Sequence, residues 1–251
     1  MKMSSIFKCL SKSKPSEAEN AFESQKPFFV NTPNPVIFDI GAYIGEVTSI
    51  YKNIFPQSAI YCFEPFTDSF QKLKKLCTDS SITAYQIAMS DKEGTALLNI
   101  NTDLSCNSLF PRPEGGFRYF SKDSENTGQI EVPTATLDSF CEKTKILAID
   151  ILKIDVEGAE LKVLTGASGL LANQAVKLIY LEVMFIAHYR QGCLFHKVAD
   201  LLSNYNYSLF NLYNLKRASN GQLRWGNAIF INRQLRSMIE SPSQQKVSIR
   251  R

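Results

Sequence analysis

The feature that most constrains the fold is an alternation of short apolar runs with segments of helical periodicity, which begins at residue 36. Val36–Ile40 and Ala59–Phe63 have the composition of strands that are buried on both faces of a sheet. Between them, Gly45–Phe55 places apolar residues at helical spacing and ends before Pro56. Repeated alternation of this kind predicts a parallel sheet with helices packed on it.

The alternation is interrupted once, by the polar stretch Asn101–Gly128. An insertion of this length is either a functional lid or a disordered loop, and the sequence leaves both open. The flanking segments Thr95–Ile100 and Gln129–Thr134 look like strands that are able to pair with each other. The remaining predicted strands are Ile82–Ala88, Ile149–Ile154, Val176–Val183, Tyr207–Leu212 and Asn227–Ile231, and the remaining predicted helices are Thr67–Leu76 (capped by Thr67), Ala159–Leu171 and Leu194–Leu202.

Length and composition suit a folded globular protein. A chain of 251 residues with 44% hydrophobic residues is able to bury one sizeable core. The first 26 residues are rich in Ser, Lys and Glu and show no sustained period. We therefore predict a flexible N-terminal arm over residues 1–30, one domain over 31–232 and a frayed tail over 233–251.

Charge and cysteine content exclude several classes of partner. The formal net charge of +4 is too small, and the basic residues too scattered, to predict nucleic-acid binding. The six cysteines form no CxxC pair, so we expect no zinc or redox site, and a reducing cytoplasm is the expected location. No apolar run approaches the roughly 18–20 residues that span a membrane. The sequence does not indicate an oligomeric state.

Two strand ends carry the pattern of an adenosine-type cofactor site. Asp39–Gly45 follows the first strand, and its glycines allow tight turns close to a ligand. The acid precedes the first glycine, which suits an ammonium partner better than a pyrophosphate, and a GxGxxG motif is absent. Glu64 follows the second strand about 20 residues later, where a carboxylate typically binds ribose hydroxyls, and Pro65 ends that strand.

A third cluster of charges lies at the end of the strand predicted over Ile149–Ile154. Strand alternation places Lys153, Asp155 and Glu157 on one side, unless the chain turns before Glu157. Charges at this edge of a parallel sheet are costly unless they are paired or used. The pattern alone fits an ion-paired strand exit as well as it fits a functional site.

The motifs together resemble the FkbM-type methyltransferases, a branch of the class I S-adenosylmethionine-dependent enzymes. The resemblance covers residues 34–232, and its most specific part is the Lys-Ile-Asp-Val-Glu-Gly-Ala-Glu run at 153–160. It implies an α/β, Rossmann-like class I fold: a mostly parallel seven-stranded sheet with an antiparallel last strand and helices on both faces. The cofactor residues that it implies are Asp39, Gly41, Ala42, Gly45, Glu64, Pro65, Gln86, Ile87, Ala88 and Asp155. Tyr43 stands where the family often has Asn or His.

The expected reaction is methyl transfer from S-adenosylmethionine to a hydroxyl of a small molecule or sugar. Methyl transfer from a sulfonium is an in-line displacement that mainly needs a positioned nucleophile. Asp155 and Glu182, with Lys153 or His188 nearby, are the candidates to orient or deprotonate the acceptor, although a lone histidine is more often structural. We expect no metal, because no ligand spacing supports one at Asp155 and Glu182.

Two other functions compete with this hypothesis. A catalytically degenerate methyltransferase fold would serve as a binding module, and the intact motif residues count against it. A nucleotide-dependent oxidoreductase predicts the GxGxxG loop that the chain lacks.

Overall fold

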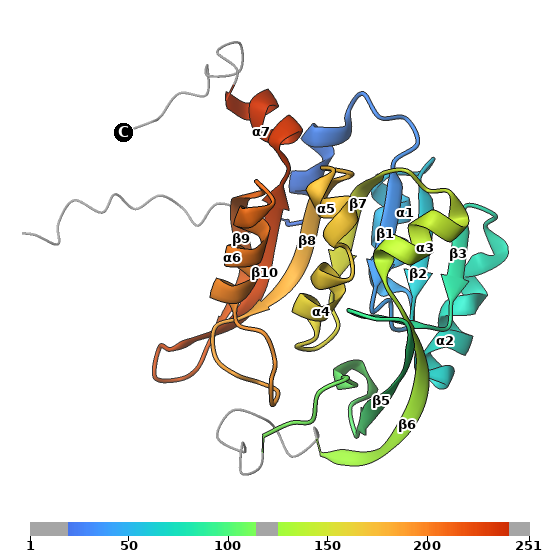
Figure 1. Cartoon of the computed structure of the whole chain (residues 1–251), viewed down its shortest axis with the longest axis vertical. Coiled ribbons are helices and arrows are strands. Elements are labelled where there is room, and N and C mark those ends of the chain that lie inside the picture. Colours follow the sequence, from blue (N-terminus) through green and yellow to red (C-terminus); the bar gives the residue numbers. More distant parts are fainter. Residues whose placement is uncertain (1–19, 114–124, 241–251) are drawn as a thin grey trace, which may run out of the picture.

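The computed structural model describes residues 20–113 and 125–240, which form a seven-stranded sheet between two layers of helices (Figure 1). The strand order is β3-β2-β1-β7-β8-β10-β9, and β10 alone runs antiparallel to its neighbours. This confirms the predicted class I topology. The strands are β1 (Val36–Ile40), β2 (Ala59–Phe63), β3 (Ile82–Tyr85), β7 (Ile149–Ile154), β8 (Val176–Met184), β9 (Ser208–Arg217) and β10 (Leu223–Ile231).

Each face of the sheet buries its own apolar cluster, which explains why the central strands are apolar on both sides. One cluster packs the sheet against α3 (Leu137–Thr144), α4 (Glu160–Thr165), α5 (Ser168–Ala172) and α6 (Phe195–Asn204). The other packs it against η1 (Glu23–Phe29), α1 (Glu46–Ile54), α2 (Thr67–Leu73) and α7 (Arg233–Glu240), with the short η2 (Lys74–Thr78) after α2.

A second, three-stranded sheet lies beyond the carboxyl ends of the main strands (Figure 1). It consists of β4 (Ala88–Met89), β5 (Gly94–Asn101) and β6 (Asn126–Ala135), and the short η3 (Leu104–Cys106) follows β5. The predicted pairing of the segments that flank the insertion is confirmed, since β5 and β6 are antiparallel partners. Residues 88–113 and 125–135 are called the roof below. The alternatives of a lid or a disordered loop were open for Asn101–Gly128, and residues 114–124 of this range lie outside the described residues.

Several elements differ from the sequence prediction. The predicted helix 159–171 is two short helices, and at Gly166 between them an added Cβ would lie 2.0 Å from the Ser90 carbonyl oxygen. Thr67 is the first residue of α2 and makes no capping hydrogen bond. Helix α3 was not predicted, although Thr136 caps it through its side chain.

Both ends of the described chain also differ from the predicted arm and tail. Residues 20–30 include η1, whose Phe29 is buried in the core, and residues 233–240 form α7, whose Leu235 is buried. The rest of the predicted arm and tail, residues 1–19 and 241–251, lies outside the described residues.

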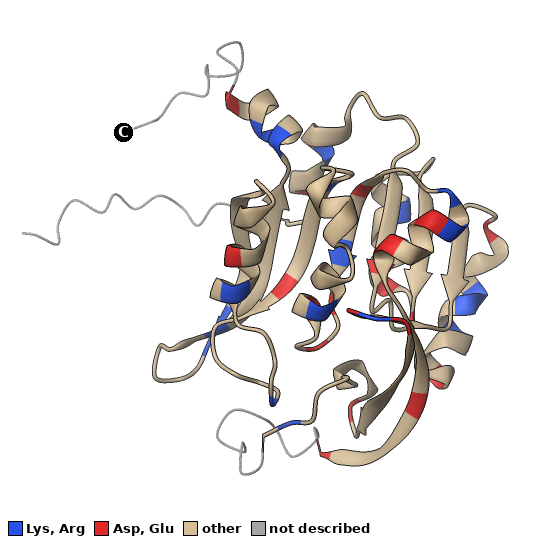
Figure 2. Ribbon diagram, viewed as in Figure 1, with Lys and Arg blue, Asp and Glu red and all other residues tan. Residues whose placement is uncertain are grey.

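Charged residues are interspersed over the outer helices in the view of Figure 2, where no large area of the described ribbon carries basic residues alone. Within the described residues, no helix is long and apolar enough to cross a membrane.

Candidate active site at the carboxyl ends of the strands

The glycine loop between β1 and α1 is shaped by close packing within the protein. Gly41 has φ +72°, and a Cβ there would lie 1.9 Å from the Asp155 carbonyl oxygen. Gly45 has φ +90°, and a Cβ there would lie 2.3 Å from the side chain of Leu76. Both glycines are therefore required by the turn and by neighbouring protein atoms. The sequence predicted that these glycines make room for a cofactor, whereas protein atoms occupy the space beside both of them.

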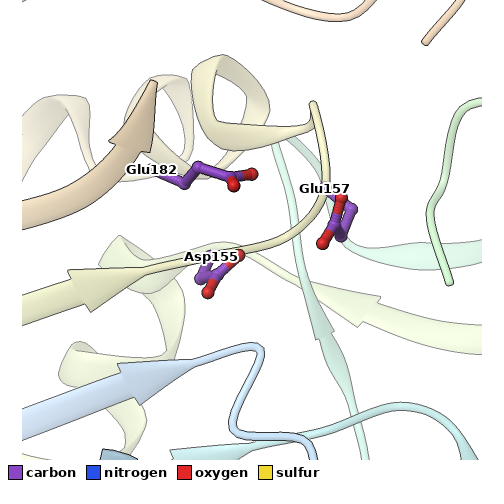
Figure 3. Close-up of side chains that lie close together, drawn as sticks. All are labelled: Asp155, Glu157 and Glu182. Atoms are coloured by element: carbon purple, nitrogen blue, oxygen red, sulfur yellow. The ribbon is translucent and has the colours of Figure 1, made fainter. Parts of the chain in front are cut away.

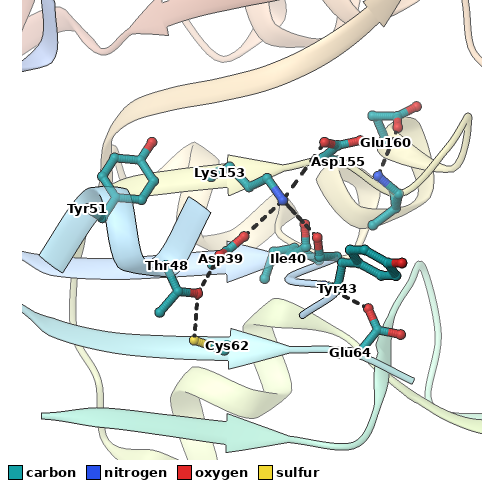
Figure 4. Close-up of polar contacts among 12 residues, drawn as sticks. Asp39, Ile40, Tyr43, Thr48, Tyr51, Cys62, Glu64, Lys153, Asp155 and Glu160 are labelled. Carbon is teal, nitrogen blue, oxygen red and sulfur yellow. Dashed lines mark hydrogen bonds and ion pairs between the residues drawn. The ribbon is translucent and has the colours of Figure 1, made fainter. Parts of the chain in front are cut away.

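Asp39 lies at the end of β1 and is fully buried beneath this loop (Figure 4). One carboxylate oxygen accepts a hydrogen bond from Thr48 Oγ1 at 2.7 Å, and the other lies 2.9 Å from Lys153 Nζ. Asp39 and Lys153 are register partners on the adjacent strands β1 and β7. The Asp39 carboxylate does not line the cavity described below, so a direct contact with a ligand ammonium has no geometric support.

Lys153 ties the glycine loop to the sheet. Its buried ammonium donates to the carbonyl oxygens of Gly41 at 2.8 Å and Ile40 at 3.3 Å, in addition to its ion pair with Asp39 (Figure 4). Burial alone would lower the pKa of Lys153, but the carboxylates of Asp39 and Asp155 raise it above its ordinary value. A lysine that stays protonated and has its donors engaged in this way is a poor general base.

Glu64 follows β2 and is held by backbone hydrogen bonds. Its Oε2 accepts from the Tyr43 N–H at 3.0 Å, and its Oε1 accepts from the Phe66 N–H at 2.8 Å. Burial raises the pKa of Glu64 to about 7, against the lowering effect of these two bonds. The carboxylate is therefore fixed in direction, and its remaining lone pairs are available to donors from a ligand.

A pocket opens between the strand ends and the roof. Of the predicted cofactor residues, Ala42, Gly45 and Gln86 are not among its lining residues, and Gln86 instead donates to Thr67 Oγ1 at 2.9 Å. The floor and walls include Gly41, Tyr43, Glu64, Pro65, Ile87, Ala88, Asp155 and Glu157, and the roof contributes Leu98, Leu104, Ser105, Asn107, Ser108 and Leu109.

Three carboxylates converge at the edge of the cavity (Figure 3): Asp155 and Glu157 line it, and Glu182 is not among its lining residues. Asp155 follows β7, Glu157 lies two residues beyond it, and Glu182 comes from the neighbouring strand β8. One oxygen of each lies within 4.8 Å of one oxygen of each of the others. Glu157 has φ +56°, so the chain does turn before its side chain, and this turn directs the carboxylate toward Glu182. The predicted pair of Asp155 and Glu182 is brought together, and Glu157 joins it.

The pKa values of two of these acids are strongly displaced. Burial, together with the charge of Asp155, raises the pKa of Glu157 to about 8. Burial and the charges of Glu157 and Asp155 raise the pKa of Glu182 well above its ordinary value. Glu160 lies behind the three, where it accepts hydrogen bonds from the Val156 and Gly158 N–H groups and stabilises the turn. The site therefore concentrates negative charge that the fold only partly compensates.

A hydrogen-bond hub connects the acids to the roof. The Tyr189 hydroxyl lies 2.6 Å from Glu157 Oε2 and 3.1 Å from an Arg112 nitrogen, and the Arg112 guanidinium lies over the Tyr189 ring. Ser108 of the roof donates to the Glu157 carbonyl at 2.7 Å. No local sequence pattern reports these roles, because Tyr189 lies 32 residues from Glu157 in sequence and Ser108 lies 49 residues from it.

His188 is buried and is not among the residues that line the cavity. Burial and the nearby charges of Arg224 and Arg112 lower the pKa of His188 to about 4. The imidazole is therefore neutral at pH 7 and is a weak base, which argues against the acid–base role considered from the sequence.

Comparison with known proteins identifies the family. The model of the methyltransferase FkbM domain matches residues 39–209, which is more than half of the chain and includes the glycine loop, Glu64 and the three acids. The chain belongs to the FkbM methyltransferase family. Its cofactor is S-adenosylmethionine.

Curated relatives are similar over part of the chain. The 2-O-methyltransferase NoeI of Sinorhizobium fredii is 25% identical over 69% of this chain and 73% of its own length. The 31-O-demethyl-FK506 methyltransferase FkbM of Streptomyces tacrolimicus is 28% identical over 53% of this chain and 60% of its own. The hexuronic acid methyltransferase AglP of Haloferax volcanii is 27% identical over 59% of this chain and 55% of its own. The matched region thus spans little more than half of the last two relatives.

Proposed function

We propose that this FkbM-family methyltransferase methylates a hydroxyl oxygen of a sugar or another small polyhydroxylated molecule. The observation that carries the proposal is the convergence of Asp155, which lines the cavity, with Glu182 from the neighbouring strand end. Carboxylates at this position are able to accept hydrogen bonds from hydroxyl groups and to take up a proton. The printed names of NoeI and FkbM specify O-methylation, and that of AglP specifies a hexuronic acid.

The opposite end of the cavity fits the adenosyl part of the cofactor. Ile87, Ala88 and Leu98 supply an apolar wall for a flat base, and Glu64 presents a fixed carboxylate to ribose hydroxyls. Gly41 and Pro65 also line this end, so we assign them contacts with the cofactor. When bound, S-adenosylmethionine supplies an electrophilic methyl group for in-line displacement.

Asp155 lies between the two ends, and we assign it the main role at the acceptor. Its side chain is 43% exposed and lines the cavity, so it is accessible to a hydroxyl group. As an ionised carboxylate it orients the acceptor oxygen and accepts the hydroxyl proton as the new carbon–oxygen bond forms. Glu182 and Glu157 hold further hydroxyl groups of the same molecule.

Lys153 and Asp39 act indirectly in this proposal. Their ion pair and the hydrogen bonds from Lys153 to the glycine loop fix the cavity floor beside Asp155. Both are positioning residues, as are Ala42 and Gly45 of the same loop. We assign His188 no proton transfer, because its pKa of about 4 leaves it without a proton to give and with little tendency to accept one.

We also propose a reducing compartment, such as the cytoplasm. The five cysteines in the described part of the chain are all free thiols, and three of them are buried. Oxidising compartments favour disulfides in proteins that retain several cysteines.

The first test measures the binding of S-adenosylhomocysteine by thermal shift, followed by a methyl-transfer screen over neutral, amino and acidic sugars. A ligand that binds only the folded state stabilises it by about 2.7 kcal/mol at 100 times its dissociation constant. We expect a shift with S-adenosylhomocysteine and turnover with at least one sugar, whose methylated product is identified by mass spectrometry. Cofactor binding with transfer only to nitrogen or carbon acceptors would contradict the proposed acceptor class.

A further inference from the structure

The three carboxylates at the acceptor end have the geometry of a cation site. The oxygens of Asp155, Glu157 and Glu182 that face one another lie within 4.8 Å. Oxygen ligands of one six-coordinate ion lie about 3–5 Å apart when each is about 2.1–2.4 Å from the ion. The three side chains come from two strand ends and one tight turn, so the main sheet holds their spacing (Figure 3).

Glu182 supplies an observation that does not depend on the spacing. Its Oε2 is buried and has no hydrogen-bond partner among the described residues, and the side chain extends toward Glu157 and Asp155 (Figure 3). Burial of a carboxylate without a partner is costly, and buried polar groups are normally satisfied by a donor, a water molecule or an ion. The neighbouring β10 residue, Asn227, is its register partner but makes no hydrogen bond to it among the contacts of the described residues.

The positive charges nearest to the three acids are shared with other partners. Lys153 lies 2.9 Å from Asp39 and 4.0 Å from Asp155, and it also donates to two loop carbonyls. Arg112 contacts the hydroxyl and the ring of Tyr189, and its charge lowers the pKa of Glu157. The Tyr189 hydroxyl makes the one hydrogen bond of the Glu157 side chain among the contacts of the described residues. A ligand that brings positive charge would therefore stabilise three carboxylates at this spacing.

We propose that Asp155, Glu157 and Glu182 bind a hard divalent cation, such as Mg²⁺ or Mn²⁺, which also binds oxygens of the acceptor. This rests on the proposed O-methylation and deepens it. A ligand set made only of carboxylate oxygens favours Mg²⁺, Mn²⁺ or Ca²⁺ over softer metals. Because Asp155 and Glu157 line the cavity, a cation held there would be within reach of two neighbouring hydroxyl groups of a sugar, and the proposed acceptor class is a vicinal diol.

The cation would favour loss of the hydroxyl proton, because a bound cation lowers the pKa of an oxygen ligand. The acceptor oxygen forms a bond to the methyl carbon while the carbon–sulfur bond breaks, and the sulfonium becomes a neutral thioether. The hydroxyl proton passes to the Asp155 oxygen that does not bind the cation and then to water. No metal was expected from the sequence, because no ligand spacing supports one at Asp155 and Glu182; the turn at Glu157, which the sequence left open, brings a third carboxylate to them.

Manganese binding to the full chain tests this directly. Electron paramagnetic resonance measures free Mn²⁺ during titration of the protein with saturating S-adenosylhomocysteine, and Mg²⁺ is then added as a competitor. We expect one Mn²⁺ per chain, displaced by Mg²⁺, and at least tenfold weaker binding in Glu182→Gln and in Asp155→Asn. The matched control is Glu131→Gln, because Glu131 is an exposed acid on β6 outside the cluster, and it should bind Mn²⁺ as the parent does.

Either of two results would contradict the proposed cation site. The first is the absence of stoichiometric binding at millimolar Mn²⁺, and the second is an equal Mn²⁺ affinity in the parent and in Glu182→Gln. A thermal shift with S-adenosylhomocysteine in every sample shows that each variant is folded, and Glu157→Gln replaces any variant that is not. Transfer to a sugar hydroxyl that persists in excess EDTA would overturn the cation and leave the proposed function intact. Mn²⁺ binding without transfer to any oxygen acceptor would count against the proposed function alone.

Discussion

The acids at the two ends of the cavity differ in how far the protein itself satisfies their carboxylates with hydrogen bonds and ion pairs. At the cofactor end, Asp39 is paired with Lys153 and Thr48, and Glu64 accepts two backbone hydrogen bonds. At the acceptor end, Glu182 Oε2 has no hydrogen-bond partner among the described residues, and Asp155 is half-buried. The carboxylates at the cofactor end stabilise the glycine loop, whereas those at the acceptor end remain available to bind a ligand. Substitutions at the two ends should therefore damage different properties of the enzyme.

The largest expected effect is on turnover at the acceptor end. Asp155→Asn should lower the rate of methyl transfer by about 10²–10⁴-fold, the usual contribution of a general base. Because the side chain is 43% exposed, the free energy of unfolding should change by less than about 0.5 kcal/mol. Single-turnover kinetics and urea unfolding measure the two quantities. A variant with parental turnover would remove Asp155 from the mechanism.

At the cofactor end, the main expected effect of a substitution is a lower free energy of unfolding rather than a lower turnover. Lys153→Met leaves Asp39 as an unpaired buried charge, which typically costs about 3–5 kcal/mol. Urea unfolding should show this loss, and Asp39→Asn combined with Lys153→Met should recover part of it. The control is Lys162→Met, which breaks a solvent-accessible pair with Asp91 and should cost less than about 1 kcal/mol. Equal losses in the two lysine variants would contradict the comparison.

Glu64→Gln should mainly weaken cofactor binding. The amide keeps one acceptor oxygen but turns a donor toward one of the two backbone N–H groups, and it removes the charge offered to ribose hydroxyls. We expect S-adenosylhomocysteine to bind about 10–100-fold more weakly, in line with hydrogen bonds to a charged group. Isothermal titration calorimetry measures this affinity. An unchanged dissociation constant would show that the ribose does not lie at Glu64.

The smallest expected effect is on the way in which the free energy of unfolding depends on pH. Glu64→Gln should remove the part of this dependence that comes from Glu64. The folded-state pKa of Glu64, raised by burial to about 7, lies above the unfolded value of 4.5, so the folded protein retains a proton that the unfolded chain releases. The resulting stabilisation is present below pH 4.5 and is lost as pH rises to 7. The stability of the parent relative to Glu64→Gln should therefore fall by about 1–3 kcal/mol between pH 4.5 and 7. A rise or no change in this difference would contradict the burial of Glu64 as an acid.

Sequence periodicity predicted the main sheet well, because strands buried on both faces leave an unambiguous apolar signal. All seven strands were predicted, five of them to within three residues, and the antiparallel direction of β10 was implied by the family resemblance. The helices of the second half were predicted less well. The close approach of Gly166 to the Ser90 carbonyl, beside the break between α4 and α5, joins residues that are far apart in sequence, so no local pattern reports it. The buried ends at Phe29 and Leu235 depend on tertiary packing in the same way.

At the site, the sequence predicted which residues gather but not which way they face. Asp39 and Lys153 appear in the motif as cofactor and catalytic candidates, yet their side chains satisfy each other inside the sheet. Gln86 lies beside Ile87 in sequence but turns to Thr67. Only the reversal of the chain at Glu157 determines that a third acid joins Asp155 and Glu182.

The roof leaves the main sheet and returns to it at adjacent points, since Ala88 and Met89 of β4 pair in parallel with Thr134 and Ala135 of β6. A whole wall of the cavity is thus one continuous piece of chain whose two attachment points are side by side. Such a segment is able to change its side chains while its two attachment points and the main strands that carry Asp155 and Glu182 stay in place.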